Sequence, residues 1–281
     1  MTTRISRPNA RFQQWEALLT NRNKRQRQGE FLVHGVRPIT LAIEHGWHIR
    51  ALLYDAERTL SGWASGVLRD TDAELVAMSP ELLCQLSDKQ QDAPELVAAV
   101  ALPTDELARI RVGPDFLGMV FDRPSMPGNI GTMVRSLDAF GGCGLITSGH
   151  SADPYDPKAV RASTGSLFAV PTVRAASHRP VVDWVRASDH PVTIIGTDEH
   201  GDADIDDIDL TGPVLLVTGN ETNGMSAGWR ESCDLIARIP IGGAASSLNA
   251  ASAATVTLYE ASRQRRCASV IHHSNCDTVK L

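Results

Sequence analysis

The stretch from Ala237 to Arg266, ARIPIGGAASSLNAASAATVTLYEASRQRR, constrains the fold more than any other part of this chain. It begins with an apolar run, passes through a loop of small residues, and continues as an Ala-rich segment with apolar residues at helical spacing, which predicts a strand, a tight loop and a helix. Small residues let backbone approach a ligand closely, and the helix start offers unpaired N–H groups beside Ser246, Ser247 and Asn249. The stretch therefore predicts either a ligand site at 242–249 or an ordinary turn with Ser246 or Ser247 as helix cap.

Two other stretches have the same character. Phe121–Gly141 reads FDRPSMPGNIGTMVRSLDAFG, and Val214–Ser226 reads VLLVTGNETNGMS. Each follows a short apolar run and turns at Gly or Pro, so each is interpreted as the carboxyl end of a parallel strand with its outgoing loop. Ligands of open α/β sheets bind outside the carboxyl ends of the strands, so we expect the three loops to line one crevice.

In this order, the three stretches resemble motifs 1, 2 and 3 of the SpoU, or TrmH-like, RNA 2'-O-ribose methyltransferases of the SPOUT class. The matching residues are PGNIG and Arg135 in motif 1, GNETNG in motif 2, and IPI followed by SSLNAA in motif 3. The likeness covers about the last 150 residues, up to Arg266. Any one of the three alone is a weak signal, whereas their joint occurrence in this order is specific.

The resemblance implies the fold class: an α/β C-terminal SPOUT domain with a parallel sheet and a deep trefoil knot, preceded by a small L30e-like α/β substrate-binding domain. Only the resemblance supports the knot, because knotted chains are rare. The family also implies a homodimer that packs its knotted regions together, with a residue of the second subunit in the active site. On the last helix, the small or apolar side chains of Ala250, Ala254 and Leu258 suit such close packing.

The resemblance places the methyl donor, S-adenosyl-L-methionine, against the backbones of motifs 2 and 3. The predicted cofactor-binding residues are Thr197, Gly219, Asn220, Gly224, Ile239, Ile241, Ser247 and Leu248. The alternative role of the two glycines is plain turn formation.

The predicted catalytic residues are Asn129, Arg135, Glu221, Ser247 and Asn249. A guanidinium stays protonated, so we expect Arg135 to clamp the neighbouring phosphate and steady the developing alkoxide, while the proton leaves to water or to a phosphate oxygen. We expect Glu221 to orient Arg135 or Asn129. Taken singly, each also has an ordinary structural role: Arg135 as a surface cation, Glu221 as a loop carboxylate and Asn129 as a helix cap.

The N-terminal third alternates short strands and helices, as a small α/β domain does. Its stretch GEFLVHGVRPITLAIEHG is similar to the opening of the L30e-like domain that often precedes a SpoU domain. That pattern commonly has an acidic residue where this chain has His34, so the role of His34, structural or in RNA contact, stays open.

Apolar runs and Gly or Pro breaks also predict boundaries. The expected organisation is an L30e-like RNA-binding domain at 1–106, a short helical linker at 107–114, a methyltransferase domain at 115–266 and a disordered tail at 267–281. Within the methyltransferase domain, six strands are expected to alternate with helices. The predicted helices include Ile130–Phe140, Pro157–Ser166 and Leu248–Arg265.

Charge is distributed unevenly along the chain. The net charge is -6, yet residues 1–37 carry eight basic and two acidic side chains, so this segment is +6 and the remainder is -12. A local basic patch matters more for nucleic-acid binding than the total charge. The basic run at 22–27 is either a solvated loop or a rim of phosphate contacts. The predicted RNA-binding residues are Arg22, Lys24, Arg25, Arg27 and Arg135.

Several other classes of site and location are disfavoured. The five cysteines form no C-x-x-C pair and the nine histidines show no ligand spacing, so no metal is expected. The acidic stretch DEHGDADIDDID lacks the glycine and terminal glutamate of an EF-hand loop. No apolar run approaches membrane-spanning length and the N-terminus lacks an apolar signal core, so we expect a cytoplasmic protein without a membrane partner.

The predicted function is S-adenosylmethionine-dependent 2'-O-methylation of RNA. Nearly the whole chain also resembles the actinobacterial rRNA methyltransferases that confer antibiotic resistance, particularly the avilamycin-resistance type acting on a 23S rRNA uridine. The stretches that carry this likeness are NARFQQWEALL, NRNKR, FDRPSMPGNIG, YDPKAVRASTGSLF and GTDEHGD. The alternatives are a tRNA 2'-O-methyltransferase and a non-catalytic rRNA-binding protein. A dinucleotide-dependent oxidoreductase is disfavoured because GNETNG is not the G-x-G-x-x-G fingerprint.

Overall fold

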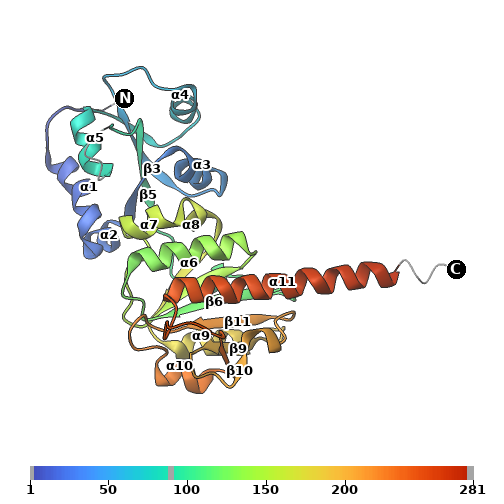
Figure 1. The fold of residues 1–281 in the computed structure, drawn as a ribbon. Coiled ribbons are helices and arrows are strands. Elements are labelled where there is room, and N and C mark those ends of the chain that lie inside the picture. Colours follow the sequence, from blue (N-terminus) through green and yellow to red (C-terminus); the bar gives the residue numbers. More distant parts are fainter. Residues whose placement is uncertain (1–2, 88–91, 277–281) are drawn as a thin grey trace. The chain divides into compact units, whose positions relative to one another are not determined.

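The computed structural model describes residues 3–87 and 92–276, with side chains up to residue 268. The chain divides into two compact units (Figure 1). The first comprises Met1–Thr104 and Tyr155–Ala169, and the second comprises Asp105–Pro154 and Val170–Leu281. The segment at 155–169, which the sequence assigned to the methyltransferase domain, is thus grouped with the first unit.

The first unit is built on a mixed five-stranded sheet of order β1-β4-β3-β5-β2, in which β5 runs antiparallel to β3 and β2. The strands are β1 Thr3–Ile5, β2 Glu30–His34, β3 Ile49–Asp55, β4 Glu74–Met78 and β5 Leu96–Ala101. The helices are α1 Ala10–Thr20, α2 Arg22–Gln28, α3 Val36–Glu44, α4 Gly62–Arg69, α5 Pro80–Ser87, α7 Pro157–Ser163 and α8 Ser166–Ala169.

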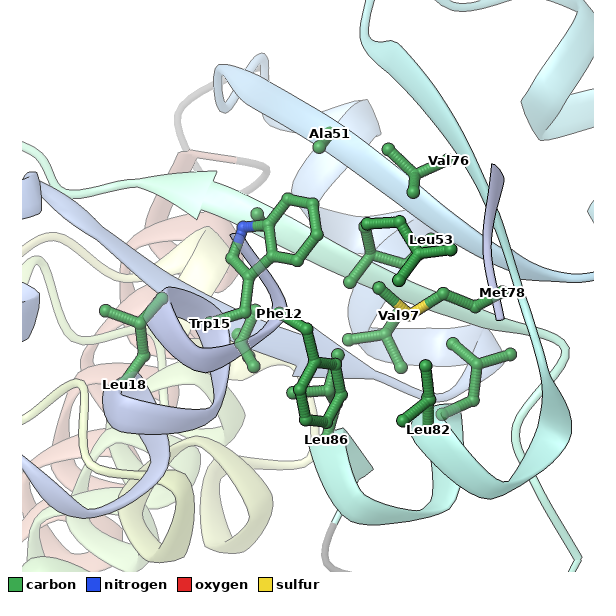
Figure 2. Packing of buried hydrophobic residues seen from close by; sticks show 14 residues of the cluster. Phe12, Trp15, Leu18, Ala51, Leu53, Val76, Met78, Leu82, Leu86 and Val97 are labelled. Atoms are coloured by element: carbon green, nitrogen blue, oxygen red, sulfur yellow. The ribbon is translucent and has the colours of Figure 1, made fainter. Parts of the chain in front are cut away.

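One core of this unit lies between α1, α5 and the sheet, as Figure 2 shows. Phe12, Trp15 and Leu18 recur at three-residue spacing and so share one face of α1. They pack against strand residues such as Leu53 and Val97, and all five side chains are buried. Helix α1 begins where the Asn9 side chain accepts a hydrogen bond from the Phe12 N–H at 2.9 Å.

The segment at 155–169 enters the first unit through aromatic contacts. The rings of Phe31, Trp47, Tyr155 and Phe168 lie 4.9–6.4 Å apart, and the Trp47 Nε1–H donates to the Phe168 carbonyl at 2.9 Å. The single helix predicted at 157–166 is two helices, because the backbone at Thr164 and Gly165 adopts positive φ values of 51° and 101°.

The basic run after α1 is helix α2 rather than a loop. The Asn21 side chain caps it by accepting from the Lys24 N–H at 3.0 Å, and Gly29 ends it in the left-handed region. Arg25 is only 2% exposed, and its guanidinium donates to the Leu18 carbonyl at 2.5 Å and to Asp156 at 3.4 Å. The prediction that Arg25 contacts RNA is therefore wrong, because its cation is used inside the unit.

We expect Arg25→Ala to lower the free energy of unfolding by about 2 kcal/mol, because it removes a buried guanidinium that donates to the Leu18 carbonyl and leaves that acceptor without its donor. Arg27→Ala, an exposed neighbour on the same helix, should change it by less than about 0.5 kcal/mol. Urea denaturation of the two variants measures both values. Equal stability of the two variants, with RNA binding lost only in Arg25→Ala, would return Arg25 to the RNA surface.

The second unit is built on a seven-stranded sheet of order β10-β12-β9-β11-β6-β7-β8, in which every pair is parallel. This confirms the predicted parallel sheet. The strands are β6 Leu117–Asp122, β7 Gly144–Ser148, β8 Thr172–Ala175, β9 Thr193–Thr197, β10 Ala203–Asp204, β11 Val214–Thr218 and β12 Leu235–Arg238. The helices are α6 Pro127–Ala139, α9 His178–Arg186, α10 Ala227–Ser232, α11 Ala250–Cys276 and the short turns η1 Leu107–Arg109 and η2 Ile205–Asp207.

Both faces of this sheet are covered by helices (Figure 1). Val120 and Leu215 belong to a cluster with Val181 of α9 and Trp229 of α10. Met119, the neighbour of Val120, is equally buried and points to the opposite face, as strand alternation requires. Buried runs on both faces explain why the strands of this unit read as nearly continuous apolar stretches.

The expected helical linker is mostly irregular chain packed on the second unit. Only η1 is helical there, and Ile110 is buried beneath Gly144, where a Cβ would lie 2.7 Å from the Ile110 side chain. Asp105 pairs with Arg174, and Arg109 donates to the Thr172 carbonyl at 3.0 Å. The segment is therefore held against the second unit by the buried Ile110 and by the polar contacts of Asp105 and Arg109. It does not form the helical linker that the sequence predicted.

Helix α11 lies against α6 and β11 of its own unit. Ala254 and Leu258 are 0% exposed and Ala250 is buried, so these residues fill the core of their own unit. The sequence suggested instead that they pack against a second subunit, and that suggestion is wrong for these three side chains. Spacing of four residues places them on one face, and that face is the inner one. The helix continues to Cys276, so 267–276 is helical rather than disordered, with no Pro or Gly to end it. The rest of the expected tail, 277–281, lies outside the described residues.

Candidate active site

The three motif loops leave the sheet at neighbouring points. The strands β12, β9, β11 and β6 are adjacent and parallel, so their carboxyl ends share one edge, as the sequence predicted. A cavity opens at this edge, here called the motif cavity. It is lined by Thr197, Asp198, Glu199, Thr218, Gly219, Asn220, Glu221, Thr222, Gly224, Ile239, Ile241, Ser247, Leu248, Ala250 and Ala253. All eight residues predicted to bind the cofactor are among them.

The motif 2 wall of the cavity is a tight turn. Asn220 and Gly224 exchange backbone hydrogen bonds of 3.0 Å, and the Asn220 Oδ1 accepts from the N–H groups of Thr222 and Asn223. Gly224 has a φ of 62°, and a Cβ at Gly219 would lie 2.3 Å from the backbone of Gly224. Both glycines are therefore required by the turn itself, before any ligand is considered.

The motif 3 wall is apolar and open. Ile241 and Leu248 are 38% and 40% exposed although both line a concave surface. Large apolar side chains left open in a cavity beside backbone and amide groups suit a flat, partly apolar ring such as adenine. The Asn249 Oδ1 caps α11 by accepting from the N–H groups of Ala251 and Ser252 at 3.0 and 3.3 Å. The expected cap at Ser246 or Ser247 is thus Asn249 instead.

Glu221 joins motif 2 to the start of α6. Its carboxylate accepts from the Ser125 N–H and hydroxyl at 3.0 and 2.9 Å, from the Met126 N–H at 3.2 Å and from the Asn129 amide at 3.0 Å. Burial alone would raise the pKa of Glu221, but the hydrogen bonds from Ser125 and Asn129 outweigh it and leave the pKa below its usual value. Glu221 is therefore held as a carboxylate.

Asn129 extends this connection to motif 3. Its Oδ1 accepts from the Asn249 amide at 3.3 Å, so Glu221, Asn129 and Asn249 form one chain of side-chain hydrogen bonds. The structure thus brings together three of the five predicted catalytic residues, and a fourth, Ser247, lines the adjoining cavity. Each motif thus contributes one residue to this series of hydrogen bonds.

Arg135 lies apart from this group. It is exposed on α6, does not line the motif cavity, and makes no hydrogen bond or ion pair with the residues that the structure describes. Of the two partners expected for Glu221, it is Asn129 and not Arg135 that Glu221 contacts. The reason is that α6 begins at Pro127, which leaves Arg135 six residues, or about 9 Å, further along the helix than Asn129.

Sequence reasoning missed two residues that hold motif 2 in place. Arg123 has a φ of 51°, its carbonyl accepts from the Asn220 amide at 2.6 Å, and its guanidinium donates to the Gly224 carbonyl at 2.9 Å. Asp122 is buried and accepts from the Ser226 N–H at 2.7 Å. The available signal was the DRP triplet directly after an apolar strand, since polar side chains at such strand ends commonly organise a site.

We expect Glu221→Gln to lower methyl transfer about tenfold to a hundredfold, because an amide cannot accept all the hydrogen bonds that the carboxylate accepts. The same variant also tests the pH dependence of stability. Folding lowers the pKa of Glu221, so the carboxylate stabilises the fold above its unfolded-state pKa, and this stabilisation is lost as the pH falls through the folded-state pKa. Acid unfolding of Glu221→Gln should accordingly be less steep than that of the wild type. Glu231→Gln, an exposed carboxylate on α10, serves as control; identical behaviour of the two variants would contradict the assignment.

Two carboxylates of the acidic stretch at 198–209 form ion pairs with arginines. Asp198 pairs with Arg230 and Asp204 with Arg238. In the described part of the chain, no group of three or more His, Cys, Asp or Glu side chains is placed to hold a metal ion. Within the same residues, no helix has the length and apolarity that crossing a membrane requires.

Comparison with known proteins identifies the family to which these motifs belong. Residues 117–259 match the SpoU rRNA Methylase family, and residues 9–98 match the SpoU L30e-like domain. The chain belongs to the SpoU rRNA methylase family. It is therefore a methyltransferase, as the three motifs predict, and a SpoU L30e-like domain precedes the methylase region.

Relatives of known activity and structure span most of the chain. A 23S rRNA (uridine(2479)-2'-O)-methyltransferase of Streptomyces viridochromogenes is 59% identical over 265 residues, which cover 93% of this chain and 92% of the relative. The SpoU methyltransferase AviRb of that organism, crystallised with AdoMet, has a TM-score of 0.88 at 59% identity, over 92% of this chain and 98% of that one. An AdoMet-bound rRNA methyltransferase from Sinorhizobium meliloti has a TM-score of 0.83 at 28% identity, over 93% and 98% of the two chains.

Proposed function

We propose that this protein transfers a methyl group from S-adenosyl-L-methionine to the ribose 2'-hydroxyl of a single uridine in 23S rRNA. The observation that carries the proposal is the hydrogen-bonded chain of Glu221, Asn129 and Asn249 beside the motif cavity. It connects all three motifs at the edge of the sheet where a ligand is expected. The 23S rRNA uridine methyltransferase from Streptomyces viridochromogenes, at 59% identity, supports the choice of RNA and nucleotide.

The motif cavity is the proposed donor site. Ile239, Ile241 and Leu248 offer an apolar wall for the adenine, and the Gly219–Gly224 turn offers backbone groups to the ribose. The bound donor supplies an activated methyl group, so the protein's own task is mainly to align the two reactants. Ser247 and Asn249 complete the polar edge that faces the acceptor.

Arg135 is the proposed phosphate clamp for the acceptor. A guanidinium holds a phosphate through two parallel hydrogen bonds and stays protonated, so it stabilises negative charge while the proton leaves to water or to a phosphate oxygen. Arg135 is exposed and away from the motif cavity of its own chain, which supports the family's arrangement in which the second subunit of a homodimer supplies a residue.

Four further features are proposed on the resemblance: the knot, the dimer, the location and antibiotic resistance. The second unit is expected to contain the deep trefoil knot, and its exposed apolar side chains, Met126, Val256 and Tyr259, are available to a dimer interface. The enzyme is proposed to act in the cytoplasm, where its ribosomal substrate is, and to confer resistance to a ribosome-targeting antibiotic.

The proposal is tested by calorimetric binding of S-adenosylmethionine, followed by transfer of labelled methyl to purified 23S rRNA, ribosomal subunits and total tRNA. Donor binding with label in 23S rRNA alone is expected. Label in tRNA alone would favour the tRNA alternative, whereas RNA binding without donor binding would favour a non-catalytic rRNA-binding protein.

A further inference from the structure

The first unit contains a cavity of its own, lined by no residue of the three motifs. It lies between α1, β2, α3, α5 and α7 and has a volume of about 330 Å³. We call it the α3–α7 cavity. It is lined by Leu19, Leu32, His34, Gly35, Arg37, Pro38, Leu86, Ser87, Pro157, Val160, Arg161 and Thr164. Its size is at the lower end of the range for small-ligand sites, about 300–1,000 Å³, which suits one compact group.

The chemistry of the lining is two-sided. Leu19, Leu32 and Leu86 make its floor apolar, and Leu86 is fully buried. Arg37 and Arg161 are exposed and belong to the lining, and the lining residues that the structure describes include no carboxylate. In a chain of net charge -6, two arginines with no carboxylate among the described lining residues make this side of the cavity cationic. Such a site favours a ligand with a flat or apolar part and an anionic part.

The rim is fixed by the fold. Arg37 donates from Nε to the Thr164 carbonyl at 3.2 Å, and Thr164 itself has a φ of 51°, which ends α7. This contact uses only the Nε of the exposed Arg37 side chain and leaves its two terminal nitrogens for another acceptor. A guanidinium that is already oriented loses less entropy when it binds a phosphate.

His34, whose role the sequence left open, is one of the lining residues of the α3–α7 cavity. It is half-buried at the end of β2 and lines the cavity, directly before Gly35, whose φ of 100° turns the chain into α3. An imidazole both stacks on a base and exchanges hydrogen bonds with its edge, which a carboxylate at this position does less well. The position of His34 thus fits a cavity for a base.

We propose that the α3–α7 cavity binds one unpaired nucleotide of the RNA substrate, with the base on the apolar floor beside His34 and the adjacent phosphate on Arg37 and Arg161. The inference rests on the proposed function in requiring an RNA substrate, but it concerns a site outside the methyltransferase motifs. A duplex does not fit, because its bases are stacked and paired, whereas single-stranded loops can present one base to a pocket.

The test is fluorescence anisotropy with two labelled probes, a ten-nucleotide single-stranded oligouridine and a ten-base-pair RNA duplex. The double variant Arg37→Ala with Arg161→Ala should bind the single strand about tenfold more weakly, with a salt dependence smaller by about two ions. Leu19→Trp, which fills the floor and keeps both charges, should weaken single-strand binding more than duplex binding. Arg69→Ala, an arginine on α4 with 75% side-chain exposure, is the control and should bind both probes as the wild type does.

Thermal unfolding and S-adenosylmethionine binding are measured on every variant, so that misfolding and failure of the donor site are recognised separately. If Leu19→Trp and the double variant each weaken binding of the single strand and of the duplex equally, the nucleotide pocket is overturned and only a phosphate-binding patch remains. Unchanged single-strand binding in the double variant would overturn it outright, even if methyl transfer by the wild type upholds the proposed function.

Discussion

Arg135→Ala is expected to lower methyl transfer about a thousandfold, because charge stabilisation at the reacting oxygen is commonly the largest single catalytic contribution. S-adenosylmethionine affinity should stay within about twofold, since Arg135 does not line the motif cavity. Arg135→Lys tests the clamp: a point charge cannot make two parallel hydrogen bonds, so its activity should remain well below that of the wild type. Single-turnover methyl transfer measures both, and full activity of Arg135→Lys would contradict the two-bond clamp. Arg179→Ala, an exposed arginine on α9, is the matched control.

The origin of Arg135 in the assembly is tested by mixing variants. If the clamp comes from a second subunit, Arg135→Ala subunits mixed with subunits that lack a working motif cavity should regain activity, because one site of each mixed dimer is complete. If Arg135 serves its own chain, no mixed dimer contains a complete site. Absence of recovery, with mixed dimers shown by mass, would therefore remove the intersubunit arrangement.

Gly219→Ala is expected to abolish donor binding. A Cβ at this position would lie 2.3 Å from both the Gly224 carbonyl carbon and the Met225 nitrogen, and neither backbone atom can move aside as a flexible side chain can. The turn must open, which moves Asn220 and Glu221 and breaks the connection to Asn129. The expected loss of stability is about 1–3 kcal/mol, the usual range for overpacked positions.

Calorimetry of S-adenosylmethionine binding measures this loss. Gly242→Ala is the control, because a Cβ there meets nothing within 4 Å although the residue lies in the neighbouring motif 3 loop. Donor affinity in Gly219→Ala equal to that of Gly242→Ala would mean that the turn is not part of the donor site.

Much of the second unit could be predicted because its signals are local. The apolar runs at 117–121 and 214–218 coincide with β6 and β11, since strands buried on both faces carry continuous apolar sequence. The parallel arrangement then places the following loops at one edge. The resemblance supplied the particular residues, and all eight predicted cofactor neighbours line one cavity.

The misplaced features depend on distant partners. The sequence predicted that Arg25 is a surface cation, because its partner Asp156 lies 131 positions away and no local pattern indicates that pairing. The grouping of 155–169 with the first unit depends in the same way on rings that meet across the sequence, such as Phe31 with Tyr155. Positive φ at Arg123 was equally invisible, because a non-glycine residue adopts it only where the surrounding structure enforces it.

The central claim is most directly tested by mapping ribose methylation in 23S rRNA that has been incubated with S-adenosylmethionine and the enzyme. Primer extension at low nucleotide concentration stops at 2'-O-methylated positions. We predict one new stop, at a uridine, which is absent when Arg135→Ala replaces the wild type. Methyl label on a base rather than on the ribose, or stops found only in tRNA, would contradict the account.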